Sequence, residues 1–290
     1  MVDSKYFIDH DSNHGLKLSF HGDIYNHKQI NDFLGRYSNL DYLYDGELFL
    51  HLIHHLLNSN LDDFDDVANY LKENQNYKFL FNNNGTIKSE FSFLIAVLYG
   101  SMKINGDFVF SISDGENVAI SRDVIGSYLL YYGCDNELLF ANNRKTLLSE
   151  GISDVKTFKP GNVMFNNKIY PPLDPPWNKI NKNNLDVNSF DANYYIKSKN
   201  TLIKLLKQSV NIRVDGLDEV GLFFSGGVDS TTVAKILKDV DGLDVKLFTV
   251  GTENSEDLEV SKKIANDLDL DLEYRLVNEE VVKSKFEDFL

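Results

Sequence analysis

The residues best suited to chemistry lie in one short segment, residues 225–230, which reads Ser-Gly-Gly-Val-Asp-Ser. Gly226 and Gly227 allow the backbone to approach a ligand closely and to adopt positive φ. The hydroxyls of Ser225 and Ser230 can donate hydrogen bonds to phosphate oxygens. Asp229 would repel a bare phosphate, so its place here indicates a Mg²⁺ ion between the carboxylate and the phosphate. The segment therefore predicts a site for a phosphate-bearing ligand.

The elements around this segment are those that such a site requires. Residues 220–224 form a continuous apolar run, typical of a buried parallel strand, and residues 231–237 have the pattern of a helix. Ligands bind at the carboxyl ends of parallel strands, and a helix N-terminus offers unpaired N–H groups to anions. The segment lacks the spacing and the lysine of a Walker A loop. A plain strand–turn–helix with an N-capping serine is the alternative interpretation.

The rest of the C-terminal region alternates between helix and strand patterns. We expect helices near residues 202–210, 258–268 and 281–290, and strands near residues 245–250 and 273–277. Such alternation implies a parallel, doubly wound sheet. We therefore predict an α/β parallel-sheet domain over residues 179–290.

The N-terminal region has a different pattern, with short apolar stretches separated by turn residues. Strands are expected at residues 16–20, 107–112, 128–132 and 138–141, and a helix at residues 47–57. This is an α+β arrangement. All five prolines fall between Pro160 and Pro176, where regular structure should lapse because proline removes donors and fixes φ. We therefore predict a first domain over residues 1–178.

Composition narrows the class of protein. Hydrophobic residues make up 42% and charged residues 25%, as in a packed domain, and the net charge is −15. Lys and Arg form no evident cluster along the sequence, which argues against nucleic acid and anionic membranes as partners. The start of the chain lacks the apolar segment of a secretory signal, and the longest apolar run, residues 93–99, is too short to span a bilayer. A cytoplasmic location is expected.

Two further features carry weaker signals. His51, His54 and His55 have i, i+3 and i+4 spacing on the expected helix, which could present two imidazoles to a metal. More often such histidines are partly buried helix residues, and we favour that interpretation. The one cysteine, Cys134, excludes a disulfide framework, and its place in an expected hairpin turn indicates no role in chemistry.

The 225–230 string after an apolar strand resembles the PP-loop of the ATP pyrophosphatase superfamily, and residues 218–222, 247–251 and 255–257 resemble asparagine synthetase in particular. The resemblance implies that aspartate attacks ATP, that pyrophosphate leaves, and that ammonia converts the acyl-adenylate into asparagine. It implies ATP and Mg²⁺ as ligands. The residues implied on pyrophosphate and metal are Ser225, Gly226, Gly227, Asp229 and Ser230, with Asp229 on Mg²⁺, and those implied beside the adenine are Phe224 and Val250.

The N-terminal region is similar to the glutaminase domain of the same family, which has an Ntn-type fold. Residues 18–26 resemble its N-G-E-I-Y-N turn, and further strings follow in the family's order at residues 45–47, 105–110, 121–133 and 159–161. By this resemblance Gly22, Asp23 and Asp45 are vestigial glutamine-binding residues. An N-cap role is the alternative for Asp45.

This region also departs from the family. The nucleophilic N-terminal cysteine is missing, and His21 replaces an asparagine that helps to stabilise an oxyanion. We therefore expect an incomplete glutaminase-like domain without activity.

Three functional interpretations follow. The first is an asparagine synthetase-type amide ligase that uses ammonia or glutamine. The second is a related β-lactam-forming synthetase, which also lacks the cysteine. The third is a non-catalytic fragment or subunit that binds ATP, because the family's later S-G-E-G-A-D-E segment and catalytic lysine do not occur in the sequence. A dimer, or a partner that supplies the missing segments, is expected in that case.

Overall fold

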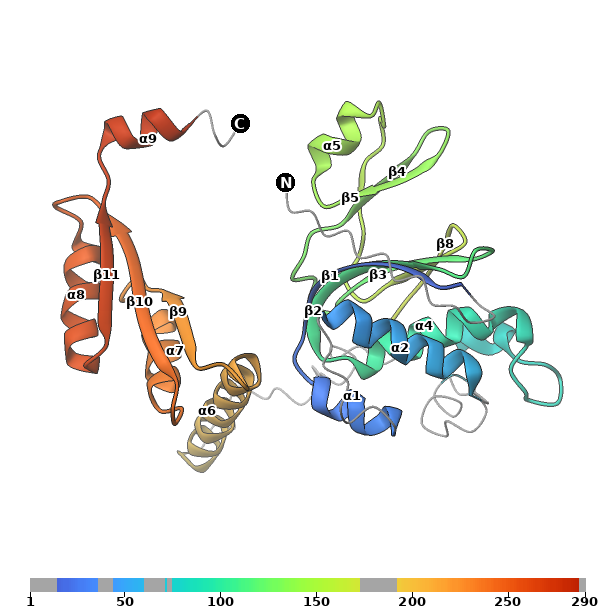
Figure 1. Ribbon diagram of the computed structural model, residues 1–290, viewed down its shortest axis with the longest axis horizontal. Coiled ribbons are helices and arrows are strands. Elements are labelled where there is room, and N and C mark those ends of the chain that lie inside the picture. The colour runs from blue at the N-terminus through green and yellow to red at the C-terminus, as the bar shows by residue number, and fades with distance from the viewer. Residues whose placement is uncertain (1–14, 36–43, 60–70, 72–74, 173–191, 287–290) are drawn as a thin grey trace. The chain divides into compact units, whose positions relative to one another are not determined.

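The computed structural model describes residues 15–35, 44–59, 71, 75–172 and 192–286 (Figure 1). The chain divides into two compact units, residues 1–185 (unit 1) and residues 186–290 (unit 2). The expected domain boundary between residues 178 and 179 lies outside the described residues. Each unit has a hydrophobic core of its own.

Unit 1 is built on an antiparallel sheet with one apolar face. Buried and less buried residues alternate along its first two strands, and Leu18 and Phe20 lie opposite Ile112 and Phe110. The strand order is β1-β2-β3-β7-β8, with bounds β1 Lys17–Ile24, β2 Gly106–Ser113, β3 Val118–Arg122, β7 Val163–Phe165 and β8 Lys168–Tyr170.

Helices cover this apolar face. In Figure 1, α2 and α4 lie along the sheet, and their side chains share its core cluster. Residues Phe93 to Gly100 of α4 are all buried, so this helix is apolar on every side. None of the described helices is long and apolar enough to cross a membrane. The helical segments of unit 1 are α1 His27–Leu34, α2 Asp45–Asn58, η2 Gln75–Leu80, η3 Ser89–Phe91, α4 Ser92–Lys103 and α5 Arg144–Ser149.

A smaller antiparallel sheet packs against the opposite face. Its order is β5-β4-β6, with bounds β4 Tyr131–Cys134, β5 Leu138–Ala141 and β6 Lys156–Thr157. Tyr132 and Phe140 share a core cluster with Ile120 and Met164 of the larger sheet. The layers are therefore helix, sheet and sheet, which confirms the α+β expectation in its general form. The expected strand at residues 128–132 was wrong in its start, since β4 begins at Tyr131. The Tyr128 carbonyl accepts a hydrogen bond from Arg122 Nη1 at 2.8 Å instead of pairing with a neighbouring strand.

The three expected histidines are half-buried residues of α2. His55 makes an edge contact with Phe33 at 5.7 Å between ring centroids, and His54 Nε2 lies 3.1 Å from Asn58 Nδ2. Among the described residues there is no group of three or more His, Cys, Asp or Glu side chains that could hold a metal ion. His54 and His55 thus contact an amide side chain of the same helix and an aromatic ring of α1, as expected for partly buried helix residues.

Unit 2 is a parallel three-stranded sheet with order β11-β10-β9, which confirms the expected alternation of strands and helices. Because successive crossovers step in one direction and are right-handed, α7 and α8 lie on the same face. Val245 and Leu247 of β10 accordingly share a core with Ala234 and Ala265. The expected doubly wound arrangement, with helices on both faces, is therefore wrong for the described strands. The bounds are α6 Ala192–Val214, β9 Glu219–Phe223, α7 Val228–Lys238, β10 Asp244–Gly251, α8 Glu256–Leu268, β11 Asp271–Leu276 and α9 Glu279–Phe286.

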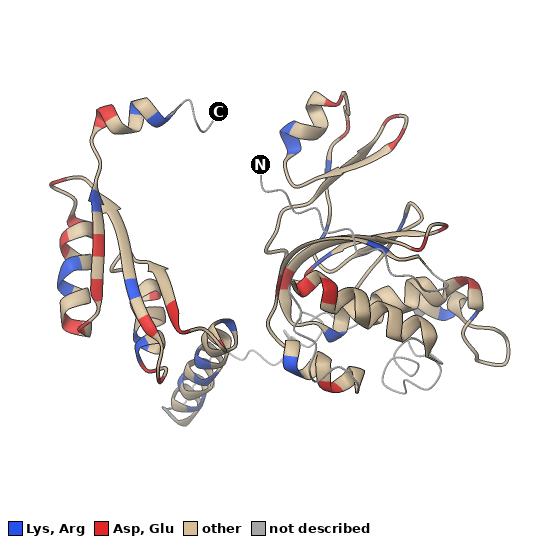
Figure 2. Cartoon of the chain, in the orientation of Figure 1, with Lys and Arg blue, Asp and Glu red and all other residues tan. Residues whose placement is uncertain are grey.

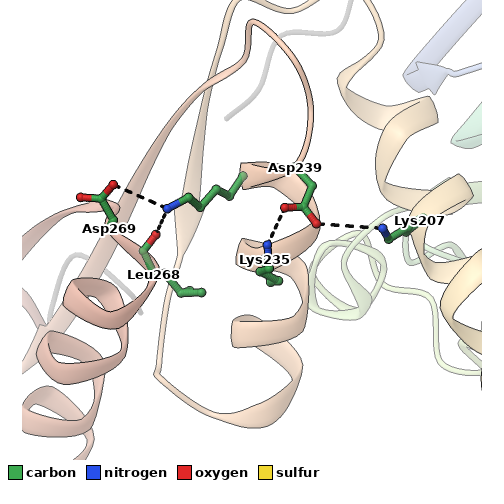
Figure 3. A network of polar contacts seen from close by, with 6 residues as sticks. Lys207, Lys235, Asp239, Leu268 and Asp269 are labelled. Carbon is green, nitrogen blue, oxygen red and sulfur yellow. Dashed lines mark hydrogen bonds and ion pairs between the residues drawn. The ribbon is translucent and has the colours of Figure 1, made fainter.

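A polar network joins the C-terminal end of α7 to its neighbours (Figure 3). The Asp239 carboxylate accepts from Lys235 at 2.5 Å and lies 4.0 Å from Lys207 of α6. The hydrogen bond from Lys235 is the main cause that lowers the pKa of Asp239. Lys238 donates to the Leu268 carbonyl and lies 3.7 Å from Asp269 at the end of α8. Exposed ion pairs of this kind contribute little to the free energy of unfolding. They do, however, link the end of α7 to α6 and to the end of α8.

The long helix α6 is basic within an acidic chain (Figure 2). It has no acidic residue, and much of its apolar surface is exposed at Tyr195, Ile196 and Leu202. At about 100° per residue, Lys199 and Arg213 lie on the opposite side of the helix from Lys197 and Lys204, so the cations do not gather on one face and the expectation that Lys and Arg form no cluster stays a prediction. The basic residues of α6 are Lys197, Lys199, Lys204, Lys207 and Arg213.

Gly22 provides a test of the pairing between β1 and β2. Its φ is +134°, and a Cβ atom there would lie 2.0 Å from the Asp107 carbonyl oxygen. Substituting Gly22→Ala should therefore lower the free energy of unfolding by roughly 2 kcal/mol or more. Urea unfolding of the full chain, followed by circular dichroism, measures the loss. Gly15→Ala, which meets nothing within 4 Å, is the control, and equal midpoints for the two variants would contradict the register.

Candidate functional site

The 225–230 loop lies at the carboxyl end of β9. Beyond that strand, the Phe224 N–H still donates to the Phe248 carbonyl of β10 at 2.7 Å, so the pairing continues for one more residue. The Phe224 side chain is only 2% exposed and belongs to the core of unit 2. The chain then turns through Ser225 to Gly227 and enters α7 at Val228. The loop is thus held on one side by the sheet and on the other by a helix.

Gly226 is required by close packing. Its φ is +69°, and a Cβ atom there would lie 2.9 Å from the backbone nitrogen of Ser261 and 3.0 Å from Val260 Cγ1, both on α8. Any other residue would have to push α8 away. Gly227 has φ −70°, so the expectation of positive φ is confirmed at Gly226 and wrong at Gly227.

The two serines of the loop face each other. Ser225 Oγ and Ser230 Oγ are 3.2 Å apart, and Ser225 Oγ accepts from the Gly227 N–H at 3.3 Å. Ser230 Oγ also lies 3.2 Å from the Gly227 carbonyl, to which it donates. The two hydroxyls expected to meet a phosphate therefore lie together. They are bonded only to the loop itself, so a phosphate oxygen could replace these contacts.

No side chain caps the start of α7. The N-cap is Gly227, so the alternative interpretation of an N-capping serine was wrong. Thr231 N–H makes the first backbone bond of the helix, to the Gly227 carbonyl at 2.9 Å. The amides of Val228, Asp229 and Ser230 are those that an α-helix leaves without an intrahelical acceptor. Their donors and the helix dipole together favour an anion at this end.

The apolar residues near the loop differ sharply in exposure. Phe224, expected beside an adenine, is buried in the core, so any contact with a base would have to use its backbone. Val250 is 63% exposed, in keeping with the expected role. Phe223 and Val228 are 89% and 80% exposed, and no signal in the sequence marks them as candidate contacts for a ligand. A continuous apolar run cannot tell which alternate side chains of a strand face the core, so the sequence alone does not separate Phe223 from Phe224.

The second set of expected residues lies in unit 1, where β1 meets the start of α2. Ile24 N–H donates to Asp45 Oδ2 at 2.6 Å, which brings Asp45 beside Gly22 and Asp23 at the end of β1. Burial is the main cause that raises the pKa of Asp45; the Ile24 hydrogen bond lowers it, and the Asp23 charge raises it. Tyr44 is the N-cap of α2, so the N-cap alternative for Asp45 was wrong.

A polar turn lies next to these residues. Asp107 accepts the hydroxyls of Tyr25 at 2.7 Å and Ser127 at 2.9 Å. The ring of Tyr128 lies 4.5 Å from that of His21, edge to face. Burial first, and then the charges of Asp23, Asp107 and Asp123, raise the pKa of Tyr128. Tyr128 and Asp107 thus lie beside the candidate residues, and in the sequence they stand only within the longer strings 121–133 and 105–110.

The contact between Gly226 and α8 can be tested by a matched pair of substitutions. Gly226→Ala should lower the free energy of unfolding of unit 2 by about 1–3 kcal/mol more than Gly242→Ala does. Both glycines have positive φ, but a Cβ at Gly242 meets nothing within 4 Å. Thermal and urea unfolding of the full chain compare them. An equal loss in the two variants would mean that the loop does not rest on α8.

Two solved structures align with this chain at low similarity. The glutamine phosphoribosylpyrophosphate amidotransferase of B. subtilis, complexed with ADP and GMP, matches with a TM-score of 0.42 and 11% identity over 96% of this chain and 52% of that chain. A structure described as the allosteric regulatory enzyme of purine biosynthesis matches with a TM-score of 0.41 and 11% identity, over 96% of this chain and 51% of that chain. These scores are too low to carry an argument about the fold.

Sequence comparisons are more specific. Residues 201–290 match the family model for asparagine synthase. A protein of Methanocaldococcus jannaschii, named as an asparagine synthetase (glutamine-hydrolyzing), is 33% identical over 243 residues, which cover 77% of this chain and 42% of that protein. The chain thus spans less than half of the length of this relative. The matched domain and the alignment through most of the sequence show that the chain is a member of the asparagine synthetase family.

Proposed function

We propose that the chain acts in an ATP-dependent amide ligase of the asparagine synthetase type, and that its 225–230 loop binds the pyrophosphate of ATP. One observation carries this proposal: the first-turn amides of α7 are uncapped and lie at the carboxyl end of β9. The family membership of residues 201–290 supports the choice of ATP over other anions. The acyl acceptor in this proposal is aspartate, or a similar carboxylate substrate.

The proposed chemistry has two steps. A side-chain carboxylate oxygen of aspartate attacks the α-phosphorus of ATP, and the bond to the oxygen that bridges to the β-phosphate breaks, so that pyrophosphate leaves. Ammonia then attacks the acyl carbon and loses a proton, and AMP departs as asparagine forms. Charge develops on the leaving pyrophosphate in the first step, where preorganised N–H and hydroxyl donors lower the barrier most. The amides of α7 and the hydroxyls of Ser225 and Ser230 are those donors.

A Mg²⁺ ion fits beside Asp229. This ion usually takes one or two protein carboxylates and completes its shell with phosphate oxygens and water, so a single exposed carboxylate in the first turn of α7 suffices. When bound, the metal would neutralise charge on the pyrophosphate. Phe223, Val228 and Val250 offer exposed apolar surface near the loop, on which an adenine could rest.

We propose that unit 1 is a glutaminase-like domain of the Ntn type that does not hydrolyse glutamine. This proposal is supported by the position of Gly22, Asp23 and Asp45, which lie together at the end of β1, where the Ile24 N–H donates to Asp45 Oδ2. The one cysteine, Cys134, ends β4 in the smaller sheet, on a different sheet from these residues. Ammonia from solution, or from a partner that hydrolyses glutamine, is therefore the proposed nitrogen source.

A second candidate function is that of a non-catalytic ATP-binding subunit. Within the described part of unit 2, β9 pairs only with β10, and its far edge carries no strand. The sheet face that bears Phe223 and Val250 lies opposite α7 and α8 and is exposed. A polypeptide from a partner, or from a second copy in a dimer, could add a strand to the free edge of β9 and pack its other residues on this exposed face. A β-lactam-forming synthetase is the third candidate, with a different acceptor and the same loop.

We also propose that the protein is a cytoplasmic enzyme without nucleic acid or membrane partners. The net charge of −15 and the small-molecule chemistry favour this location. The basic surface of α6 is compatible with this proposal, because its cations are interleaved with exposed apolar residues.

ATP binding in the presence of magnesium tests the loop. Asp229→Asn should weaken MgATP binding about tenfold or more, because it removes a charged metal ligand, and should change ATP binding in EDTA much less. Isothermal titration calorimetry of the full chain measures both. Asp267→Asn, on the exposed surface of α8, is the matched control. The loop assignment fails if the wild-type chain binds no ATP, or if Asp229→Asn leaves the affinity for MgATP unchanged.

Pyrophosphate release separates the candidate functions. With MgATP and ammonium, the ligase proposal expects release that depends on aspartate, and little gain when glutamine replaces ammonium. Retained ATP binding without release for any amino acid would instead favour the non-catalytic subunit. Release that depends on another carboxylate would favour the β-lactam-type synthetase. A coupled pyrophosphate assay on the full chain is sufficient for all three.

A further inference from the structure

A buried hydroxyl beneath the 225–230 loop has no hydrogen-bond partner among the described residues. It is Ser261 Oγ of α8, and Ser261 as a whole is 0% exposed. Leaving a buried hydroxyl unpaired costs free energy, and buried polar groups without a partner are few in folded proteins. The position of Ser261 therefore calls for a state of the protein in which its hydroxyl is paired.

Ser261 packs directly on the loop. A Cβ atom at Gly226 would lie 2.9 Å from the backbone nitrogen of Ser261 and 3.0 Å from its Cα. Side chains of an α-helix tilt toward its N-terminus. Because α8 begins just after the carboxyl end of β10, and β10 runs parallel to β9, this tilt directs the Ser261 side chain toward the sheet edge that carries the loop.

The backbone of Gly226 is also without a partner. Gly226 is buried, and its N–H and carbonyl form no hydrogen bond within the described residues. The next N–H, that of Gly227, donates to Ser225 Oγ at 3.3 Å. In a trans peptide the carbonyl points the opposite way from the N–H, so the Gly226 carbonyl points away from the serine hydroxyls. An acceptor without a donor and a donor without an acceptor thus occur where Gly226 packs on Ser261.

The loop is loosely closed in this ligand-free structure. Ser225 N–H donates to Ser230 Oγ at 3.4 Å, and the two serine oxygens are 3.2 Å apart. These distances are at or beyond the long end of the usual range for such bonds. Hydrogen bonds to a phosphate are charge-assisted and therefore shorter and stronger. A phosphate that replaced the internal contacts would draw the loop tighter and shift the Gly226 peptide.

We propose that Ser261 is a positioning residue of the loop, and that its hydroxyl donates to the Gly226 carbonyl when a diphosphate occupies the loop. This inference rests on the proposed function of residues 225–230. The bond would hold the Gly226–Gly227 peptide so that the Gly227 N–H faces the anion, and Ser261 itself would not touch the ligand. Since the hydroxyl is unpaired without ligand, it contributes to affinity and not to the stability of the free chain.

Ser261→Ala tests the inference through two readouts that should move differently. Isothermal titration calorimetry of the full chain with MgATP, and with inorganic pyrophosphate and magnesium, should show binding about fivefold weaker than in the wild type, as expected for one lost hydrogen bond. Thermal unfolding without ligand should give a melting temperature equal to that of the wild type or higher, because the unpaired hydroxyl is gone. A merely structural role would lower the melting temperature.

Two further variants isolate the hydrogen bond. Ser261→Cys keeps a side chain of similar size but is a weak donor, so it should lose affinity as Ser261→Ala does. Ser101→Ala removes a helix hydroxyl of unit 1 that donates to the Val97 carbonyl at 2.7 Å. It should lower the melting temperature and leave both affinities unchanged.

The outcomes separate this inference from the proposed function. If the wild-type chain binds neither MgATP nor pyrophosphate, the proposed function fails and the role of Ser261 fails with it. If the wild type binds but Ser261→Ala or Ser261→Cys keeps full affinity, only the role of Ser261 is overturned. A lower melting temperature or a failure to fold in Ser261→Ala would also overturn it, because the hydroxyl would then support the free fold.

Discussion

The contact between the 225–230 loop and α8 is the constraint on which the candidate nucleotide site depends. Gly226 lies so close to the backbone of Ser261 that no side chain fits between them. This contact allows β9 to turn within three residues and α7 to begin at once, without a capping side chain. The uncapped amides of α7 therefore face solvent at the end of the sheet, where an anion can accept their hydrogen bonds. Close packing at one glycine thus helps to position the donors of the candidate site.

A buried carboxylate has the corresponding role in unit 1. Asp123 accepts N–H groups from the next turn of the chain and from β2, and so holds residues 123–127 in place. That turn positions Ser127 against Asp107 and Tyr128 against His21. It also presents the Tyr128 carbonyl to Arg122. One saturated acceptor therefore organises the polar turn near Asp45 and positions the carbonyl to which Arg122 donates.

The two units differ in how completely they bury their apolar surface. In unit 1 both faces of the larger sheet have cover, from α2 and α4 on one face and from the smaller sheet on the other. In unit 2 the helices α7 and α8 share one face, and Phe223, Val250 and the apolar residues of α6 stay exposed. Exposed apolar patches of this kind mark binding surfaces. The 225–230 loop lies at the edge of this surface, so the proposed nucleotide and a partner would meet there.

Much of the fold could be read from the sequence. The apolar run of residues 220–224 and the helical stripe of residues 258–268 predicted their elements to within a few residues, because periodicity depends on local spacing alone. The loop string also identified Ser225 and Ser230 as a pair. By contrast, the sequence shows α4 only as an apolar run and does not predict a helix there, because a helix buried on all sides has no periodic pattern.

What only the tertiary structure decided are the contacts between distant parts of the chain. The string of residues determined that a glycine-rich turn joins a strand to a helix, but not that Phe224 enters the core while Phe223 faces outward. It placed Asp45 at the start of a helix, but not against Ile24, and it gave no sign that Arg122 would donate to the Tyr128 carbonyl. The physical reason is that burial and hydrogen-bond partners depend on which elements pack together. Side chains that are distant in the sequence come into contact only after those elements have packed.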